Sequence, residues 1–338
     1  MADLETARAA PSTAARGQGE LELRLEQHRA ELTAYCYRML GSAFEAEDAV
    51  QETLVRAWRG FERFDGRAAV RSWLYRIATN VCLDLLKGKK RRALPMDLGP
   101  ATSGAVEPGR TLPEVTWIEP MPDSRVVPAD GDPAEVAVAR ETVRLAFVAA
   151  LQHLPPRQRA ALILCEVLRW KATEVAELLE TSVASVNSAL QRARATLETS
   201  DLSDAGTSAS LDEADAELLA RYVEAFERYD MDALTSLIRE DATQSMPPYE
   251  LWLSSRDDIL AWWVGPGGGC RGSRVIPAVA ANGAPAFGQY KPSATGEGYE
   301  PWALQVLEIE RDRIVGFTFF LDTDRVFPLF GLPTTFDA

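Results

Sequence analysis

Histidine and cysteine are scarce in this chain, whose 338 residues contain only two histidines and four cysteines. The cysteines, at positions 36, 82, 165 and 270, have neither metal-ligand nor disulfide spacing, and three lie in apolar helical patterns. We therefore expect small core residues, no metal site and no cofactor. Long apolar runs are also missing, and the first residues lack the apolar core of a signal peptide. These absences exclude a membrane-spanning protein and predict a cytoplasmic one.

The negative charge of the chain is concentrated at one end. Lys and Arg number 36 against 50 Asp and Glu, which gives a net charge of −14. Residues 1–200 hold 26 basic and 27 acidic side chains, whereas residues 201–338 hold 10 and 23. Because a polyanion responds to the local field more than to the total charge, the net acidity does not exclude nucleic-acid binding by the nearly neutral first part.

The stretch 70–92 has the clearest helical pattern. Its apolar residues recur from Trp73 to Leu86 at the i, i+3, i+4 spacing of an amphipathic helix. Two interpretations fit its basic end: a solvated helix end that favours the helix dipole, or a row of phosphate contacts. The basic end consists of Lys87, Lys89, Lys90, Arg91 and Arg92.

Residues 20–92 as a whole are predicted to form an all-helical domain after a disordered tail, residues 1–19. One helix is expected to end at Gly41, since glycine commonly terminates helices, and a second to begin near Glu45. The second helix has a small, apolar face and a polar face. That polar face includes Asp48, Gln51 and Glu52.

The next segment, residues 93–134, contains eight prolines and seven acidic residues against two arginines. This proline density excludes a helix or a central strand, so we expect an extended linker. Acidic charge beside a cationic helix could also imitate nucleic acid, but keeping the segment soluble is the simpler interpretation.

Residues 135–199 are predicted to form a second helical domain that ends in a helix-turn-helix. Thr173 is expected to cap a helix that runs to Leu179, and Ser182 to cap the next. The turn between them has no glycine, which need not disturb the fold because not every such turn uses a left-handed residue. The last helix would enter a major groove, although a helical hairpin without a DNA role has the same pattern. Its expected inward positions are Val183, Val186, Leu190 and Ala193.

A linker at residues 200–211 leads to a C-terminal domain, residues 212–330, and a tail, residues 331–338. Helical periodicity comes first and alternating strands follow, which indicates an α+β fold with antiparallel strands. The glycine-rich stretch 265–272 is predicted to be a flexible loop. The predicted helices are 213–229, 232–238 and 257–264, and the predicted strands are 242–248, 274–281, 286–291, 302–310 and 314–322.

Residues 20–200 resemble the extracytoplasmic-function (group IV) sigma factors of the bacterial sigma-70 family. Five features in the family's order carry the resemblance, and the helix-turn-helix is one of them. The resemblance implies two all-α sigma domains and a promoter-specificity subunit of RNA polymerase. The other four features are Ala46–Trp58 (AEDAVQETLVRAW), Phe64–Arg67 (FDGR), Arg71–Asp84 (RSWLYRIATNVCLD) and Leu154–Arg159 (LPPRQR).

The resemblance also implies three binding surfaces. The clamp helices of the polymerase β′ subunit would bind Asp48, Gln51 and Glu52. The −10 DNA would be held by Phe64, Asp65, Arg67, Asn80, Lys87, Lys89, Lys90, Arg91 and Arg92. The −35 DNA would be read by Ser182, Ser185, Asn187, Ser188, Gln191, Arg192 and Arg194. Family recognition helices often carry Lys or Arg where this chain has Asn187 and Ala189, so readout would lean on neutral polar side chains.

Residues 212–330 resemble the SnoaL-like α+β cone, through Tyr222–Asp230 (YVEAFERYD), the Met246-Pro-Pro stretch and Trp252. Such cones enclose an apolar pocket, which implies a small hydrophobic ligand. Some relatives are enzymes with an Asp base, but no acidic residue here can be assigned to that role, so no catalysis is expected. The expected lining or core residues are Met246, Trp252, Trp262, Trp302 and Phe319.

We therefore expect a sigma factor, itself not an enzyme, whose cone regulates it in cis. The expected contact elements are residues 200–212 and the loop 265–272. An alternative is a sigma-fused sensor or enzyme that uses the apolar pocket. A DNA-binding repressor is disfavoured, because a repressor needs no helix that docks on polymerase.

Overall fold

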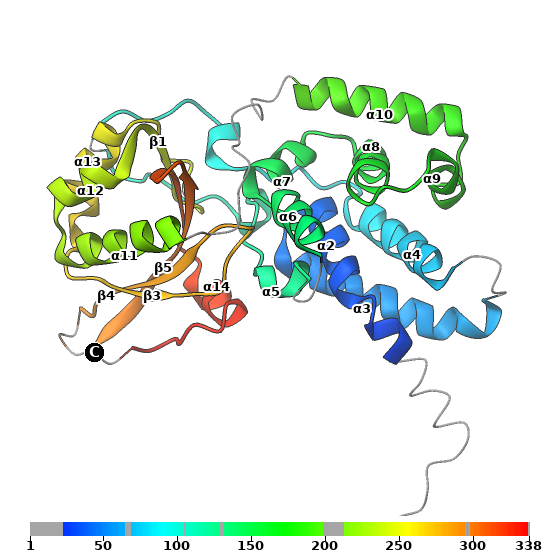
Figure 1. Ribbon diagram of the computed structural model, residues 1–338, viewed down its shortest axis with the longest axis horizontal. Coiled ribbons are helices and arrows are strands. Elements are labelled where there is room, and N and C mark those ends of the chain that lie inside the picture. The colour runs from blue at the N-terminus through cyan, green and yellow to red at the C-terminus, as the bar shows by residue number, and fades with distance from the viewer. Residues whose placement is uncertain are drawn as a thin grey trace, which may run out of the picture.

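The computed structural model describes residues 23–64, 69–104, 106–128, 132–198, 213–294, 296 and 298–336. The predicted tail 1–19, the linker 200–211 and the candidate residues Asp65 and Arg67 lie outside the described residues. Figure 1 shows a helical body and, beside it, a C-terminal cone built on a sheet. Among the described residues, none of the helices combines the length and apolar character that a membrane span requires.

The first helical domain consists of three main helices, α2, α3 and α4. Gly41 ends α2 in a left-handed conformation, with φ of 70° and its N–H bonded to Tyr37 O at 2.8 Å. Ser42 then caps α3, because its hydroxyl accepts the N–H of Glu45 at 3.1 Å. The bounds are α2 Arg29–Leu40, α3 Ala43–Gly60, the 3-10 turn η1 Phe61–Arg63 and α4 Val70–Leu85.

The basic end predicted for the helix of residues 70–92 lies beyond it. Helix α4 ends at Leu85, and Gly88 reverses the chain with φ of 72°. The five cations therefore lie on an irregular segment that turns back toward the helical body, where acidic partners are within reach.

The second helical domain contains the expected helix-turn-helix, α9 and α10. Ser182 caps α10 by accepting the N–H of Ser185 at 3.1 Å, as predicted. Three details differ: Lys171, not Thr173, is the N-cap of α9; Val183 is 38% exposed; and Glu180 in the turn is left-handed, with φ of 52°. The bounds are α6 Pro133–Glu141, α7 Leu145–Gln152, α8 Pro156–Leu162, a π-helical turn Ile163–Val167, α9 Ala172–Leu178 and α10 Val183–Glu198.

The proline-rich segment 93–134 is packed between the domains, and the expectation that it holds no helix is wrong. Trp117, Ile118 and Met121 are almost completely buried. Proline restricts helix length but is tolerated in the first turn, so only single turns form. These are η2 Pro95–Asp97, η3 Glu114–Thr116 and α5 Asp123–Val126.

The C-terminal domain is an α+β cone, as predicted, with a six-stranded sheet in the order β2-β1-β6-β5-β4-β3. The sheet is mixed, because β1 pairs with β6 in parallel. The helices are α11 Glu213–Arg228, α12 Met231–Leu237, α13 Arg256–Val264, the 3-10 helix η6 Pro266–Cys270 and α14 Thr323–Leu329. The strands are β1 Ile238–Ser245, β2 Trp252–Leu253, β3 Arg274–Pro277, β4 Ala286–Pro292, β5 Tyr299–Glu310 and β6 Arg313–Phe320.

Two parts of the cone were not anticipated: η6 lies within the predicted loop 265–272, and α14 follows the last strand. The two sides of the sheet belong to different cores. One side, with Phe287 and Phe317, packs with α11 to α13. The other, with Leu304 and Phe320, joins α14 and the helical body in one apolar cluster. The cone is thus built onto the helical body through a shared core.

Candidate functional sites

Helix α3 presents the predicted docking face to solvent. Asp48, Gln51 and Glu52 are all exposed, while Ala49 and Val50 on the opposite side are completely buried. The carboxylate of Glu52 pairs with Arg56 one turn further along at 2.7 Å. The face is rigid, polar and unobstructed, which are the properties a docking surface needs.

An aromatic cluster lies at the start of the predicted −10 surface. The ring centroids of Phe64 and Trp73 are 4.9 Å apart, and those of Phe61 and Trp73 are 6.3 Å apart. Asn80 lies further along α4 and is exposed. Aromatic rings of this kind can stack on an unpaired base, and Asn80, about two turns further along the same helix, offers an exposed amide.

The basic segment after α4 is largely committed to partners inside the helical body. Lys87 pairs with Asp84 at 2.7 Å and Lys89 with Glu45 at 2.8 Å, while the Arg91 guanidinium lies 2.7 Å from the His153 ring. In the described part of the chain no cone residue pairs with these cations.

Arg92 cannot hold a phosphate in this conformation. It is 5% exposed, and its guanidinium donates to Trp117 O at 2.7 Å and pairs with Glu45 at 3.1 Å. The Arg92 guanidinium, predicted to bind a phosphate, thus binds backbone carbonyl oxygens of the segment 114–117 instead. Lys90 is exposed and, within the described ranges, has no hydrogen-bond or ion-pair partner.

If Lys90 contacts a promoter phosphate, as the sequence predicts, Lys90→Ala should lower the salt dependence of promoter binding by about one unit of slope without breaking an ion pair. Affinity should fall to a similar degree for every promoter sequence. Titration of holoenzyme with promoter DNA at several salt concentrations measures the slope. Arg221→Ala, on exposed α11 of the cone, is the control. An unchanged slope in Lys90→Ala would remove this lysine from the DNA surface.

Helix α10 exposes most of the residues predicted to read DNA. Val186, Leu190 and Ala193 anchor it, as expected. Ser188 is half-buried and accepts a hydrogen bond from Arg192 at 2.7 Å, and Arg194 pairs with Glu166. The exposed members of the predicted set are Ser182, Ser185, Asn187, Gln191, Arg192 and Arg194.

The two helical domains are closed on each other. The ring of Trp170, just before α9, meets Tyr75 of α4 at a centroid distance of 5.1 Å, and Arg71 of α4 lies over it at 5.5 Å. Deeper in the interface, Arg159 of α8 is 2% exposed and donates to the carbonyl oxygen of Met39 in α2.

A single hairpin of the cone links both helical domains and the segment between them. Asn282, 1% exposed, donates from Nδ2 to Tyr37 Oη at 2.6 Å and to Val143 O at 2.7 Å. Its Oδ1 accepts the N–H of Met121 at 2.9 Å. Its neighbour Gly283 packs so tightly that an added Cβ would lie 2.9 Å from the carbonyl oxygen of Arg140. The expected contact loop 265–272 does not provide these bonds, and the other expected contact element, 200–212, lies outside the described residues.

Glu119 lies at a second three-way contact. Its carboxylate, 8% exposed, accepts the hydroxyl of Ser42 in the first domain and pairs at 3.2 Å with Arg325 of α14 in the cone. Burial raises the pKa of Glu119 to about 6, against the opposing effect of its hydrogen bond and neighbouring cations.

Because the pKa of Glu119 is higher in the folded protein than its ordinary value of 4.5, folding favours the protonated form. The stabilisation of the folded state by the protonated carboxyl is fully present below pH 4.5 and is lost as the pH rises through about 6. The wild type should lose about 1 kcal/mol of unfolding free energy between pH 5 and 7, out of about 2 kcal/mol over the whole titration, and Glu119→Gln should remove this loss. Urea titrations across that range measure the effect. Glu107→Gln, which alters an exposed carboxylate of the same segment that does not affect the pKa of Glu119, should leave the pH dependence as in the wild type.

The predicted apolar pocket exists inside the cone but is nearly filled. Met246, Trp262, Trp302 and Phe319 line a cavity of about 20 Å³, whose lining includes no carboxylate and no imidazole. Trp252 does not line it and instead bonds to the segment 93–134.

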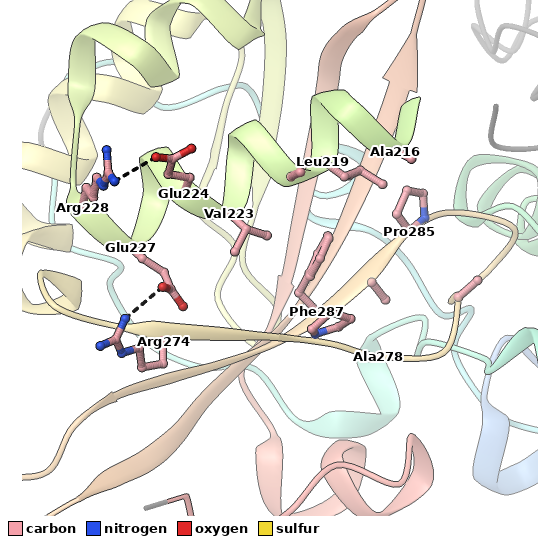
Figure 2. Close-up of a pocket in the computed structure, with 14 residues that line it drawn as sticks. Ala216, Leu219, Val223, Glu224, Glu227, Arg228, Arg274, Ala278, Pro285 and Phe287 are labelled. Carbon is pink, nitrogen blue, oxygen red and sulfur yellow. Dashed lines mark hydrogen bonds and ion pairs between the residues drawn. The ribbon is translucent and has the colours of Figure 1, made fainter. Parts of the chain in front are cut away.

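A larger hollow, of about 840 Å³, lies between α11 and the β3–β4 hairpin (Figure 2). Leu219 and Val223 face Phe287 across it, and Glu227 pairs with Arg274 at its rim at 3.0 Å. Glu227 also accepts the N–H of Val275 at 3.0 Å. This bond occupies a backbone donor of the edge strand β3 that could otherwise pair with a strand of another chain. Nothing in the local pattern of the sequence pointed to this groove, because its two walls come from separate elements.

Two helical domains, a helix-turn-helix with an exposed recognition helix and an appended α+β cone define a modular DNA-binding protein. Three family models match in that order: Sigma-70 region 2 over residues 25–92, Sigma-70 region 4 over residues 144–197 and the SnoaL-like domain over residues 219–317. From here the helical domains are called region 2 and region 4.

Two curated relatives from one organism are similar to this chain. It is 46% identical over 322 residues to the ECF RNA polymerase sigma factor SigG of Mycobacterium tuberculosis, which covers 94% of this chain and 85% of that protein. It is 31% identical over 221 residues to the ECF RNA polymerase sigma factor SigJ of the same organism. That alignment covers 65% of this chain and 61% of SigJ. The crystal structure of SigJ has the same fold, with a TM-score of 0.57 at 23% identity over 94% of this chain and 99% of that one.

The chain therefore belongs to the extracytoplasmic-function sigma factors of the sigma-70 family, and it carries a C-terminal SnoaL-like domain.

Proposed function

We propose that the chain directs RNA polymerase to its promoters through α3, α4 and α10, and that the cone holds regions 2 and 4 in a closed arrangement that must open for this. The observation that carries the proposal is the bonding of one cone residue, Asn282, to region 2, to region 4 and to the segment between them.

The closed arrangement is incompatible with reading both promoter elements. Positions −10 and −35 are 25 base pairs apart, roughly 85 Å along straight B-DNA at 3.4 Å per pair. Here α9, the first helix of the helix-turn-helix, lies directly against α4: Arg76 of α4 donates to Glu177 O of α9 at 3.4 Å. The DNA-binding helices must therefore separate before they can bind both elements at once.

Polymerase binding is assigned to the exposed acidic face of α3. We expect the double variant Asp48→Arg, Glu52→Arg to lose core polymerase binding by at least 100-fold, because two favourable charge contacts become repulsive. The helical content should remain that of the wild type and the melting temperature should change little, since both side chains are exposed and the Glu52–Arg56 pair that is lost contributes only about 0.5 kcal/mol.

Affinity for purified core enzyme, measured by fluorescence anisotropy of labelled protein, tests this assignment. Glu217→Arg, on the exposed surface of α11 in the cone, is the control for added positive charge. Normal core affinity in the double variant would place the docking surface elsewhere. Catalysis by the cone is not part of the proposal, because the residues that line its inner cavity include no carboxylate, imidazole or amine.

A further inference from the structure

The segment between regions 2 and 4 lies along the cone as a strap, defined here as residues 99–104 and 106–112. Two tryptophans of the cone hold it by equivalent bonds. The indole N–H of Trp252 donates to Gly99 O at 2.9 Å, and that of Trp262 donates to Val106 O at 3.1 Å. Further along, the N–H of Leu112 bonds to Pro248 O at 2.9 Å. Two strap N–H groups also bond to the cone, that of Thr102 to Trp252 O at 2.8 Å and that of Gly104 to Asp258 Oδ1 at 2.7 Å. The bond from Trp262 therefore holds the stretch that lies between these contacts and Leu112.

Trp262 differs from Trp252 in also forming a wall of the inner cavity. Its ring is 6% exposed and packs on the backbone of Gly267, where an added Cβ would lie 2.4 Å from a ring carbon. Trp263 packs edge-to-face against the rings of Phe226 and Phe317, at centroid distances of 5.7 and 5.5 Å. Trp262 and Trp302 have no such ring partner among the described residues that line the cavity, and of these two walls Trp262 is the one bonded to the strap.

One polar group in the cavity lacks a partner. Gln244 is completely buried and lines the cavity, and its Oε1 accepts the indole N–H of Trp263 at 2.8 Å. That bond fixes the orientation of the amide, since only the oxygen can accept. Gln244 Nε2 is then left as a buried donor without an acceptor in the described residues. Such a donor favours a ligand that brings an acceptor.

We propose that the inner cavity of the cone binds a small, mostly apolar molecule with one hydrogen-bond-acceptor oxygen, and that its entry displaces Trp262 and releases the strap. The oxygen accepts from Gln244 Nε2, and the apolar part takes the space of the displaced indole. The present volume of about 20 Å³ has room for a single water, so anything larger must move a wall.

Displacing Trp262 breaks its bond to Val106 O, so ligand occupancy and strap release are thermodynamically linked. Because the strap joins regions 2 and 4, its release makes the opening described above easier. The regulatory consequence rests on the proposed function, whereas the linkage itself can be tested without polymerase.

Cyclohexanone is a suitable probe, because it combines an apolar ring with one carbonyl oxygen, and cyclohexane is the matched compound without the acceptor. Strap release is read from trypsin cleavage after Arg110, an exposed residue of the strap. We expect cyclohexanone, and not cyclohexane, to accelerate cleavage at Arg110 in the full-length protein about fivefold or more, the equivalent of one hydrogen bond.

The two tryptophans supply matched variants. Trp262→Phe keeps an apolar wall but loses the donor, so its strap should be cleaved rapidly without the probe and respond little to it. Trp252→Phe loses an equivalent bond to the strap but leaves the cavity intact, so it should still respond to cyclohexanone. Gln244→Met, with a similar volume and no donor, should bind the probe more weakly than the wild type by about fivefold. Melting temperatures verify that each variant is folded.

Three results would overturn the inference: no acceleration by cyclohexanone, equal effects of both compounds, or identical behaviour of Trp262→Phe and Trp252→Phe. Each would leave the cavity as the place of a structural water only. In vitro transcription separates this inference from the proposed function. If the probe releases the strap while promoter output stays constant, the Trp262 linkage stands and regulation by the cone fails.

Discussion

The variant Asn282→Gly is expected to open the interface between the cone and the helical body. Three hydrogen bonds are lost, and two of their buried partners, Val143 O and the Met121 N–H, are left unpaired, a cost of about 3 kcal/mol. Glycine is the informative replacement because Asn282 has φ of 54°, a left-handed conformation that glycine adopts without strain.

Promoter output from holoenzyme should then rise several-fold, because the closed arrangement loses its central bond. Multiple-round transcription measures the output, and small-angle scattering measures the opening. Gly283→Ala provides an independent test, since its Cβ would meet Arg140 O at 2.9 Å and force the same separation. Val279→Ala, 44% exposed, is the control. Opening without any change in output would contradict regulation of the sigma regions by the cone.

The second large effect is expected for Arg159→Met. The guanidinium donates to Met39 O across the domain interface and also to Gln152 Oε1 at 2.5 Å and Leu154 O at 3.2 Å. Replacing it with an apolar side chain of similar length leaves these buried acceptors unsatisfied. We expect a loss of about 3 to 5 kcal/mol in unfolding free energy, well above that of a surface substitution.

Urea unfolding followed by circular dichroism measures this loss. Arg157→Met makes the same change two residues earlier on α8, where the side chain is exposed, and should change stability by less than about 0.5 kcal/mol. Similar stability of the two variants would show that Arg159 does not hold regions 2 and 4 together.

Burial lowers the pKa of Arg159 to about 10, so its charge is retained at neutral pH. The LPPRQR motif that identifies region 4 in the sequence thus contains an interface residue, and motif recognition alone could not reveal that role. The same holds for Arg92, which the local charge pattern grouped with phosphate-binding residues and the fold places under backbone carbonyl oxygens.

Local chemistry explains what could be predicted from the sequence. Apolar spacing located α3, α4 and α10, and the predicted cap Ser182 acts as expected. The exposed face with Asp48 also follows, because one helix determines its own polar and apolar sides. All of these features depend on residues within about one or two helical turns of each other.

The sequence by itself therefore determined the family, the order of the three domains, the helix-turn-helix and the helix faces that carry candidate binding residues. Only the tertiary structure decided which of those residues are available, how the strap lies on the cone and where Asn282 is inserted. The physical reason is distance along the chain: Asn282 bonds to Tyr37, 245 residues away, and Trp262 to Val106, 156 residues away. Periodicity and capping describe neighbours in sequence, whereas these bonds depend on how separate domains pack.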